Sequence, residues 1–236
     1  MRPRALLCDA AGTLFVPRRP VAESYAAVFV QHGLRVLPSA IAGVFQQVFE
    51  NAPPMAFPKA PAAEIPSLER GWWRGIVEQG LSRASPRREP RDFEACFDAL
   101  FAYFARPTSW RLLPGTTEVL GAFRARGVRL GIASNFDLRI HEILSGLGIA
   151  AHFQAVILPA QVRCTKPDPL FFRYALEQLD STATETVFLG DDLERDLAGA
   201  RAAGMQAVHA PSLATLSDLP NLIAGLAEVS PERSMK

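Results

Sequence analysis

The sequence predicts an α/β fold, in which helices cover both faces of a parallel β-sheet and an all-helical domain is inserted into the chain. Two patterns lead to this prediction. After Trp110, short apolar runs alternate with helical patterns, as expected of parallel strands joined by right-handed crossover helices. Residues 21–106 instead show apolar side chains at helical spacing and no convincing strand. We therefore expect a core formed by residues 1–16 and 108–236, and a helical domain at residues 17–107.

The first strand is expected at residues 4–8, RALLC, an apolar run that ends at Asp9 and a Gly-Thr turn. Four helices should follow it. A proline-rich stretch at residues 51–66 separates the second of these helices from the third, and predicts a rigid loop because proline fixes φ and removes a backbone donor. The apolar stripes that define the four helices lie within residues 21–29, 41–49, 72–77 and 93–104.

Strands and helices alternate through the rest of the chain. Asp137 and Asp168 are expected to cap helices, as is Thr116 or its neighbour Thr117, because side-chain oxygens of these types accept hydrogen bonds from the first free amides of a helix. The remaining strands are expected at residues 128–133, 153–158, 186–190 and 206–210.

Polar side chains follow four of the expected strands. Asp9 comes directly after the first strand and Ser134 after the second, Lys166 lies in the loop after the third, and Asp191 follows the fourth. Ligands of parallel sheets bind at the carboxyl ends of the strands. A carboxylate nucleophile, a hydroxyl donor, a lysine and an acidic metal ligand suit phosphoryl transfer. The sequence therefore predicts a phosphoryl-transfer site at this edge of the sheet.

Four motifs along the whole chain resemble the haloacid dehalogenase-like (HAD) hydrolase superfamily. Its Asp-x-Asp-Gly-Thr motif compares with DAAGT at 9–13, its second motif with LGIASN at 130–135, its lysine motif with KPDP at 166–169, and its acidic motif with GDDLERD at 190–196. The stretches PVAESYAAVFVQHGL, RGWWRGIVEQ and SNFDLRIHEILSGLG resemble the domain-containing protein 3 branch of this superfamily. The resemblance implies a Rossmann-like core and a type-one cap, a four-helix domain that closes over the site and selects the substrate.

The resemblance also implies a role for each motif residue. Asp192 and Asp196 have a second interpretation, since either could simply stabilise the first turn of the following helix. Trp72 and Trp73 are expected to pack between helices. The implied site has Asp9 and Lys166 as catalytic residues, Ser134, Asn135 and Lys166 as phosphate-binding residues, and Asp9, the Ala11 carbonyl, Asp191 and Asp196 as ligands of Mg²⁺.

Ala11 departs from the phosphatase pattern of the superfamily. Its phosphatases carry an aspartate there that protonates the leaving oxygen and later activates water, and an alanine can do neither. The branch named above is similar to this chain in lacking that aspartate. Loss of a positioned general acid/base lowers a rate by about 10² to 10⁴. We therefore expect phosphomonoester hydrolysis through an aspartyl-phosphate at Asp9, with low activity.

Three alternatives stay open. Phosphonoacetaldehyde hydrolases resemble this chain at Asp-x-Ala-Gly-Thr but need a Schiff-base lysine in the cap, where this chain offers only Lys59 in the proline-rich loop. The 2-haloacid dehalogenases carry a tyrosine at position 11 and use no metal, so Asp191 and Asp196 oppose that interpretation. A phosphate-binding or regulatory protein without turnover is the third alternative.

Composition excludes other classes of function. The formal net charge is +1, which gives no sign of nucleic-acid binding. Cys8, Cys96 and Cys164 are too widely spaced for a zinc site or a disulfide framework. Neither a signal peptide nor a membrane span is expected, since the apolar runs are short. We expect a cytoplasmic protein that acts on a small phosphorylated substrate, with no membrane partner; the oligomeric state does not follow from the sequence.

Overall fold

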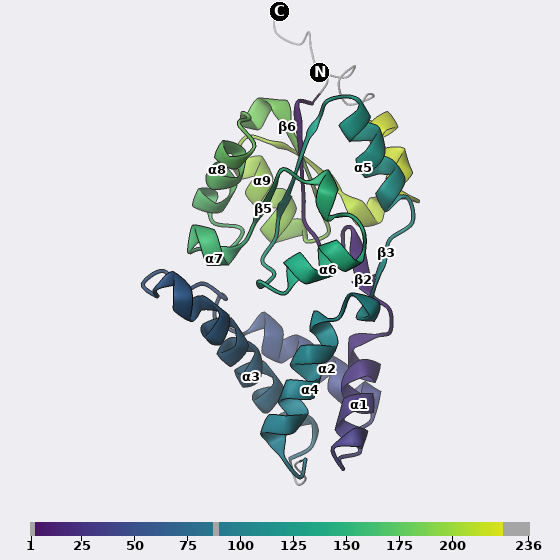
Figure 1. Ribbon diagram of the computed structural model, residues 1–236, viewed down its shortest axis with the longest axis vertical. Coiled ribbons are helices and arrows are strands. Elements are labelled where there is room, and N and C mark those ends of the chain that lie inside the picture. Colours follow the sequence, from purple (N-terminus) through teal and green to yellow (C-terminus); the bar gives the residue numbers. More distant parts are fainter. Residues whose placement is uncertain (1–2, 87–89, 224–236) are drawn as a thin grey trace, which may run out of the picture. The chain divides into compact units, whose positions relative to one another are not determined.

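The computed structural model describes residues 3–86 and 90–223, and the chain divides into two compact units (Figure 1). The α/β unit comprises Met1–Val16, Leu112–Phe136 and Gly148–Lys236, and the helical unit comprises Pro17–Arg111 and Asp137–Leu147. The sequence places the second boundary at 107/108 and the whole of 108–236 in the core. In the structure this boundary lies at 111/112, and residues 137–147 group with the helices.

A five-stranded parallel sheet forms the centre of the α/β unit in the described part of the chain. Its order is β5-β4-β1-β6-β7, and Ala5 of the central strand lies opposite Arg129 on one side and Thr186 on the other. Every residue of β1 is fully buried, as the apolar run at residues 4–8 predicts. All the expected strands are confirmed: β1 (Ala5–Cys8), β4 (Arg129–Ala133), β5 (Ala155–Ile157), β6 (Thr186–Gly190) and β7 (Gln206–His209).

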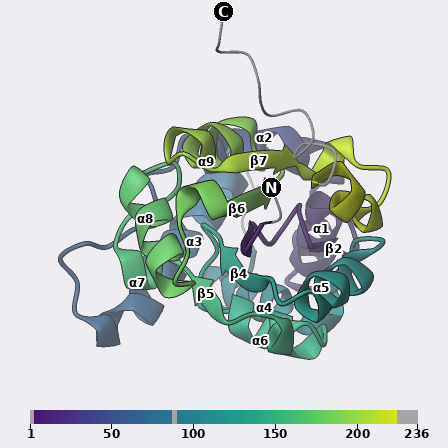
Figure 2. The same ribbon diagram turned by 90° about the horizontal axis from the view of Figure 1, so that it is seen from above.

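Helices cover both faces of this sheet, with α8 (Pro169–Gln178) and α9 (Gly199–Ala202) on one face and α5 (Thr116–Ala125) on the other (Figure 2). On the α8 face, Phe171 and Phe172 pack with Phe188 of β6 in one buried cluster. The unit is completed by α7 (Pro159–Val162), the helical segment η5 (Leu193–Ala198) and the short turns η3 (Ala150–His152), η4 (Ala183–Glu185), η6 (Ala210–Ser212) and η7 (Leu216–Asp218).

The helical unit contains the expected four helices together with α6 (Ile140–Gly146) and the turns η1 (Ala62–Glu64) and η2 (Pro107–Ser109), within the described residues. Its core is aromatic, and Tyr25, Phe29 and Phe45 lie within ring contact of one another. The proline-rich loop is confirmed except at its end, where a helix begins at Ile65. Pro66 does not prevent this helix, because proline is tolerated in a first turn. The four helices are α1 (Val21–Gln31), α2 (Pro38–Glu50), α3 (Ile65–Ala84) and α4 (Phe93–Ala105).

One of the predicted helix caps is confirmed, and three local details differ from the sequence expectations. Asp168 caps α8 as predicted, by accepting a hydrogen bond from the Leu170 amide. Asp137 and Thr116 do not cap: α6 begins later, and the Thr116 hydroxyl donates to backbone carbonyls instead. A two-stranded sheet, β2 (Phe15–Pro17) with β3 (Trp110–Leu112), was not expected, because three-residue strands leave no periodic pattern. No helix in the described ranges has the length and apolarity that crossing a membrane requires.

Candidate active site at the carboxyl ends of the strands

Asp9 stands at the end of the central strand. Its amide donates to the Leu189 carbonyl of the neighbouring strand, and its side chain is buried. The chain then turns at Gly12, whose φ of +96° favours glycine. A Cβ at Gly12 would lie 2.3 Å from Asp191 Oδ2, so glycine also permits this close approach. The turn directs the Thr13 hydroxyl, which donates to Asp191 Oδ1 at 3.0 Å.

Lys166 lies between two carboxylates. Its Nζ donates to Asp9 Oδ1 at 2.7 Å and to Asp196 Oδ1 at 2.5 Å, and the side chain is buried. Asn135 holds the backbone of Lys166 in place. Its Nδ2 donates to the Lys166 carbonyl, and its Oδ1 accepts from the Lys166 amide. Both polar groups of the Asn135 side chain are thereby engaged. Ser134, expected to hold phosphate, is buried, and its Oγ accepts from the Phe136 amide at 3.3 Å.

The three aspartates of the acidic motif have different partners. Asp192 accepts from the Glu194 and Arg195 amides, which confirms that it stabilises the first turn of η5. Asp196 Oδ2 accepts from the Asp191 and Asp192 amides at 3.2 Å, while its Oδ1 faces Lys166. Asp191 accepts from the Thr13 hydroxyl with Oδ1 and is half-buried.

Negative charge is in surplus at this site. Among the described residues, Asp9, Asp191 and Asp196 each offer an oxygen within 4.8 Å of the others, and Lys166 is the cation between them. Burial raises the pKa of each of the three carboxyls, although Lys166 opposes this shift. Burial alone would lower the pKa of Lys166, but Asp9 and Asp196 outweigh it and the pKa is raised. A hard divalent cation such as Mg²⁺ fits this all-oxygen donor set.

The structure also describes Ala11 and Lys59, on which the alternative functions depend, and the two adjacent tryptophans. Ala11 is half-buried, two residues after Asp9, and its methyl group carries no proton. Lys59 is exposed, whereas a Schiff-base lysine needs burial or a neighbouring cation to lower its pKa. The exposure of Lys59 weakens the phosphonate interpretation. Trp72 and Trp73 form ring contacts with Phe49 of α2, which agrees with a packing role.

Comparison with known protein families matches residues 3–204 to the haloacid dehalogenase-like hydrolases. The chain belongs to this family. It is 34% identical over 202 residues to the haloacid dehalogenase-like hydrolase domain-containing protein 3 of Homo sapiens, covering 86% of this chain and 79% of the relative. It is 30% identical over 178 residues to a phosphoserine phosphatase of Thermus thermophilus, covering 69% of this chain and 70% of that protein.

Solved structures of this hydrolase family share the fold. The L-2-haloacid dehalogenase RSc1362 superposes with a TM-score of 0.73 at 19% identity, over 95% of this chain and 100% of that one. YfnB of Bacillus subtilis, solved bound to magnesium, gives a TM-score of 0.71 at 16% identity, over 95% of this chain and 100% of that one. At such low identities the likeness concerns the fold alone. The Rossmann-like core predicted from the motifs is thereby confirmed.

One neighbour of the site was missed by sequence reasoning. His209, at the end of β7, approaches the Asp191 carbonyl with Nε2 at 3.0 Å. Because a carbonyl oxygen only accepts, this nitrogen must carry a hydrogen. The signal in the sequence was a histidine at the carboxyl end of a parallel strand, the same position that identified Asp9 and Asp191.

Proposed function

We propose that this hydrolase cleaves small phosphomonoesters with Mg²⁺ and an aspartyl-phosphate at Asp9. The observation that carries the proposal is the arrangement of Asp9, with its nucleophilic oxygen beside Lys166 Nζ inside a carboxylate cluster of surplus negative charge. The phosphoserine phosphatase relative and a ribulose-1,5-bisphosphate 5-phosphatase of Halopiger xanaduensis, 35% identical over 129 residues, support phosphate esters as substrates. The all-oxygen donor set of Asp9, Asp191 and Asp196 supports the metal.

In this proposal the metal is held by Asp9, the Ala11 carbonyl and Asp191. Asp196 adds negative charge to the same group, and its two oxygens also hold Lys166 and the Asp191 amide in place. When bound, Mg²⁺ supplies positive charge that offsets the phosphoryl oxygens.

The residues of the chain account for the remaining steps. An Asp9 carboxylate oxygen attacks the phosphorus in line, and the ester oxygen leaves on the opposite side and takes a proton from solvent. A water oxygen then attacks the phosphorus of the aspartyl-phosphate, Asp9 leaves as a carboxylate, and the proton of that water goes to solvent. Lys166 offsets charge that builds on the equatorial oxygens, and the Ser134 hydroxyl donates a hydrogen bond to one of them. Asn135 acts on this step through the backbone of Lys166. Ala11 gives no proton to the leaving oxygen, so esters of weakly basic alcohols and phenols should react fastest.

The test is phosphate release from a broad panel of phosphomonoesters, with and without Mg²⁺, and with Asp9→Asn as the blank. The proposal expects magnesium-dependent release that disappears in the variant. Release that persists in Asp9→Asn would contradict the nucleophile, and release that is equal without Mg²⁺ would contradict the metal.

Ala11 also favours a second candidate function, a regulatory protein that binds phosphate without turnover. Such a protein would bind inorganic phosphate with Mg²⁺ and release none from any ester in the panel. The buried Asp9–Lys166 pair opposes this candidate, because a phosphate-binding site gains nothing from a second negative charge at the position of the ligand.

A further inference from the structure

We propose that Trp73 of α3 is a positioning residue for the proposed phosphoryl transfer. It acts through Asp137 on the stretch of chain just before it, which carries Ser134 and Asn135. The inference rests on the proposed function, because that function places the Ser134 hydroxyl on a phosphoryl oxygen and has Asn135 act through the backbone of Lys166. It goes further by giving a residue of the helical unit a part in the reaction.

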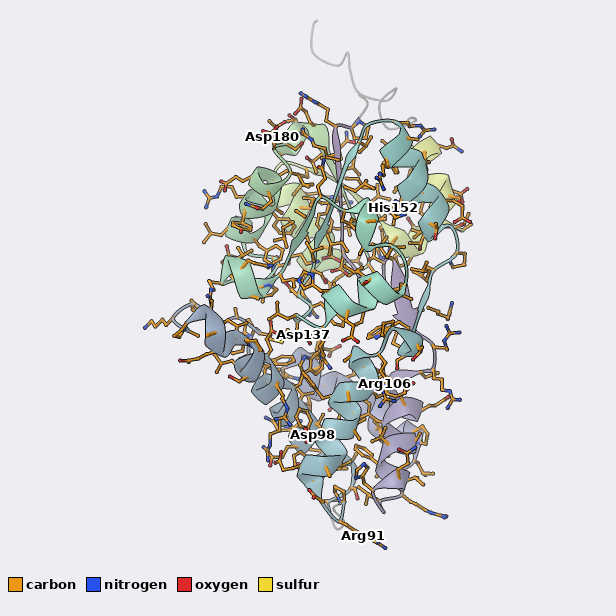
Figure 3. The ribbon with its side chains drawn as sticks, viewed as in Figure 1. Arg91, Asp98, Arg106, Asp137, His152 and Asp180 are labelled. Atoms are coloured by element: carbon orange, nitrogen blue, oxygen red, sulfur yellow. The ribbon has the colours of Figure 1, made fainter. Side chains whose placement is uncertain are left out.

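The indole N–H of Trp73 donates to a buried carboxylate. Its Nε1 lies 2.6 Å from Asp137 Oδ2, and Asp137 (labelled in Figure 3) is 1% exposed. A hydrogen bond to an ionised acceptor is shorter and stronger than one between neutral groups. Packing against Phe49 accounts for the ring of Trp73 but not for this bond, since a phenylalanine would pack there and donate nothing. The N–H therefore indicates a role besides packing.

The two residues after Asp137 are also held by helices of the same unit. The Leu138 amide donates to Glu69 Oε2 of α3 at 3.1 Å. Arg139 Nη1 donates to the Phe101 carbonyl of α4 at 3.1 Å, and the guanidinium lies over the Phe101 ring. Three consecutive residues are thereby fixed to α3 and α4.

The chain before Asp137 is fixed to the α/β unit. The Ser134 amide donates to a carbonyl of β5 at 3.1 Å, and Asn135 bonds to both backbone groups of Lys166. Phe136 alone separates these two fixed stretches, and one residue contributes only two soft backbone dihedral angles. A change in the position of Asp137 is therefore passed along the backbone to Asn135 and Ser134.

The Ser134 hydroxyl depends on the same backbone. Its Oγ accepts from the Phe136 amide at 3.3 Å. A hydroxyl has one hydrogen to donate and two lone pairs that accept, so an amide that occupies a lone pair restricts where the hydrogen points. In the proposed reaction that hydrogen is donated to a phosphoryl oxygen. Displacement of Phe136 would remove this restriction and lower the fraction of time in which the hydroxyl is correctly oriented.

Trp73→Phe removes the N–H and keeps an aromatic ring. The variant should fold, because Asp137 keeps its hydrogen bonds to Arg139. Trp72→Phe is the matched control, since it removes an indole N–H from the neighbouring position of α3. The Trp72 Nε1 donates to the Pro53 carbonyl at an exposed site, where water can replace it.

The experiment measures kcat and KM for p-nitrophenyl phosphate on the whole chain with Mg²⁺, below the thermal midpoint of each variant, with Asp9→Asn as the blank. Inhibition constants for orthovanadate, which mimics the transition state, and for inorganic phosphate are measured on the same samples. Hydrogen exchange followed by mass spectrometry monitors peptides that span residues 134–136. Loss of folded protein lowers the apparent kcat but leaves an inhibition constant unchanged, so the orthovanadate constant separates positioning from folding.

The inference predicts that kcat falls by about 10- to 100-fold in Trp73→Phe, because a small misplacement of reacting groups has an effect of this order. Orthovanadate should bind more weakly by a similar factor and phosphate by a smaller one, since catalysis depends on binding the transition state. Residues 134–136 should exchange faster. Trp72→Phe should match the unaltered chain in all of these measurements.

Several results would overturn the inference. These are an unchanged kcat or orthovanadate constant in Trp73→Phe, an equal loss in both variants, and a fall in kcat without faster exchange at residues 134–136. With Asp9-dependent release in the unaltered chain, any of them leaves the proposed function standing. If the unaltered chain shows no such release, the proposed function fails and this inference fails with it.

Discussion

Each unit of this protein buries a cluster of charged side chains, and the two clusters differ in how their charge is balanced. In the helical unit, Asp137 (labelled in Figure 3) accepts from Arg139 Nε and Nη2 and from Trp73 Nε1. The guanidinium of Arg139 lies over the Phe101 ring at 3.9 Å and donates to the Phe101 carbonyl. Both Asp137 oxygens are thus satisfied by donors of the protein itself.

The α/β cluster is different, because Asp9, Asp191 and Asp196 face the single ammonium of Lys166 among the described residues. Buried charge that lacks a partner is costly, so a protein keeps it where a ligand completes the balance. The comparison teaches that burial and charge alone do not identify a site. A closed ion pair such as Asp137–Arg139 stabilises the fold, and an unbalanced cluster indicates a place for a cation.

The largest expected effect is the loss of activity in Asp9→Asn. An amide oxygen is a poor nucleophile, so turnover should fall by a factor on the order of 10⁴ or more. The thermal midpoint should change little, since Lys166 keeps Asp196 as a partner. Phosphate release and differential scanning calorimetry on the same samples check both parts. A large fall in midpoint with retained turnover would reverse the roles assigned to the two clusters.

The next effect is on stability, in Arg139→Met. This change leaves the Asp137 carboxylate buried without its cation, which typically costs about 3–5 kcal/mol in the free energy of unfolding. The control is Arg129→Met. Arg129 pairs with Asp180, which points into solvent (Figure 3), so loss of this ion pair should lower the free energy of unfolding by only about 0–1 kcal/mol. Urea denaturation compares the two variants. Equal costs would show that the Asp137–Arg139 pair is no more structural than an exposed one.

A smaller effect is expected from Gly12→Ala, matched with Gly127→Ala. Both glycines have positive φ, so each substitution should cost about 1–2 kcal/mol in backbone strain. Only at Gly12 would the new Cβ also meet Asp191, since nothing lies within 4 Å of a Cβ at Gly127. Magnesium-dependent turnover should therefore fall in Gly12→Ala and stay unchanged in Gly127→Ala. A similar fall in both variants would point to strain and not to the carboxylate.

A further prediction concerns the pH dependence of stability from Glu69, which is buried in the helical unit and accepts from the Leu138 amide. Burial raises its pKa from 4.5 to about 7; the nearby Asp137 adds to the shift, while the Leu138 amide and Arg139 oppose it. A raised carboxyl pKa gives stability that is present below 4.5 and is lost as the pH rises through about 7.

Glu69→Gln keeps an acceptor for the Leu138 amide and removes this titration. The free energy of unfolding of the unaltered chain, measured relative to Glu69→Gln, should therefore decline across this pH range. A difference that is flat with pH, or that grows as the pH rises, would contradict the assignment.

The parts of the fold and site that were predictable are those with local or periodic signals. Apolar runs predicted the five strands. Polar residues directly after three of the strands predicted Asp9, Ser134 and Asp191, and the loop after another strand predicted Lys166; the structure brings these four residues together. Asp137 was expected only as a helix cap. Its partner Trp73 lies 64 positions away, and the amide that faces Glu69 lies 69 positions away. Contacts over such distances leave no pattern in the sequence, so the contact of Asp137 with Trp73 and the grouping of residues 137–147 with the helices were not predictable.

Calorimetric titration of Mg²⁺ into the whole chain tests the central claim most directly, namely that the unbalanced cluster is a cation site. The matched variants are Asp191→Asn and Asp192→Asn, which remove the same charge from neighbouring positions; asparagine at 192 can still cap η5. The account predicts one Mg²⁺ bound by the unaltered chain and by Asp192→Asn, and loss of binding in Asp191→Asn. Equal binding by both variants, or no binding by the unaltered chain, would contradict it.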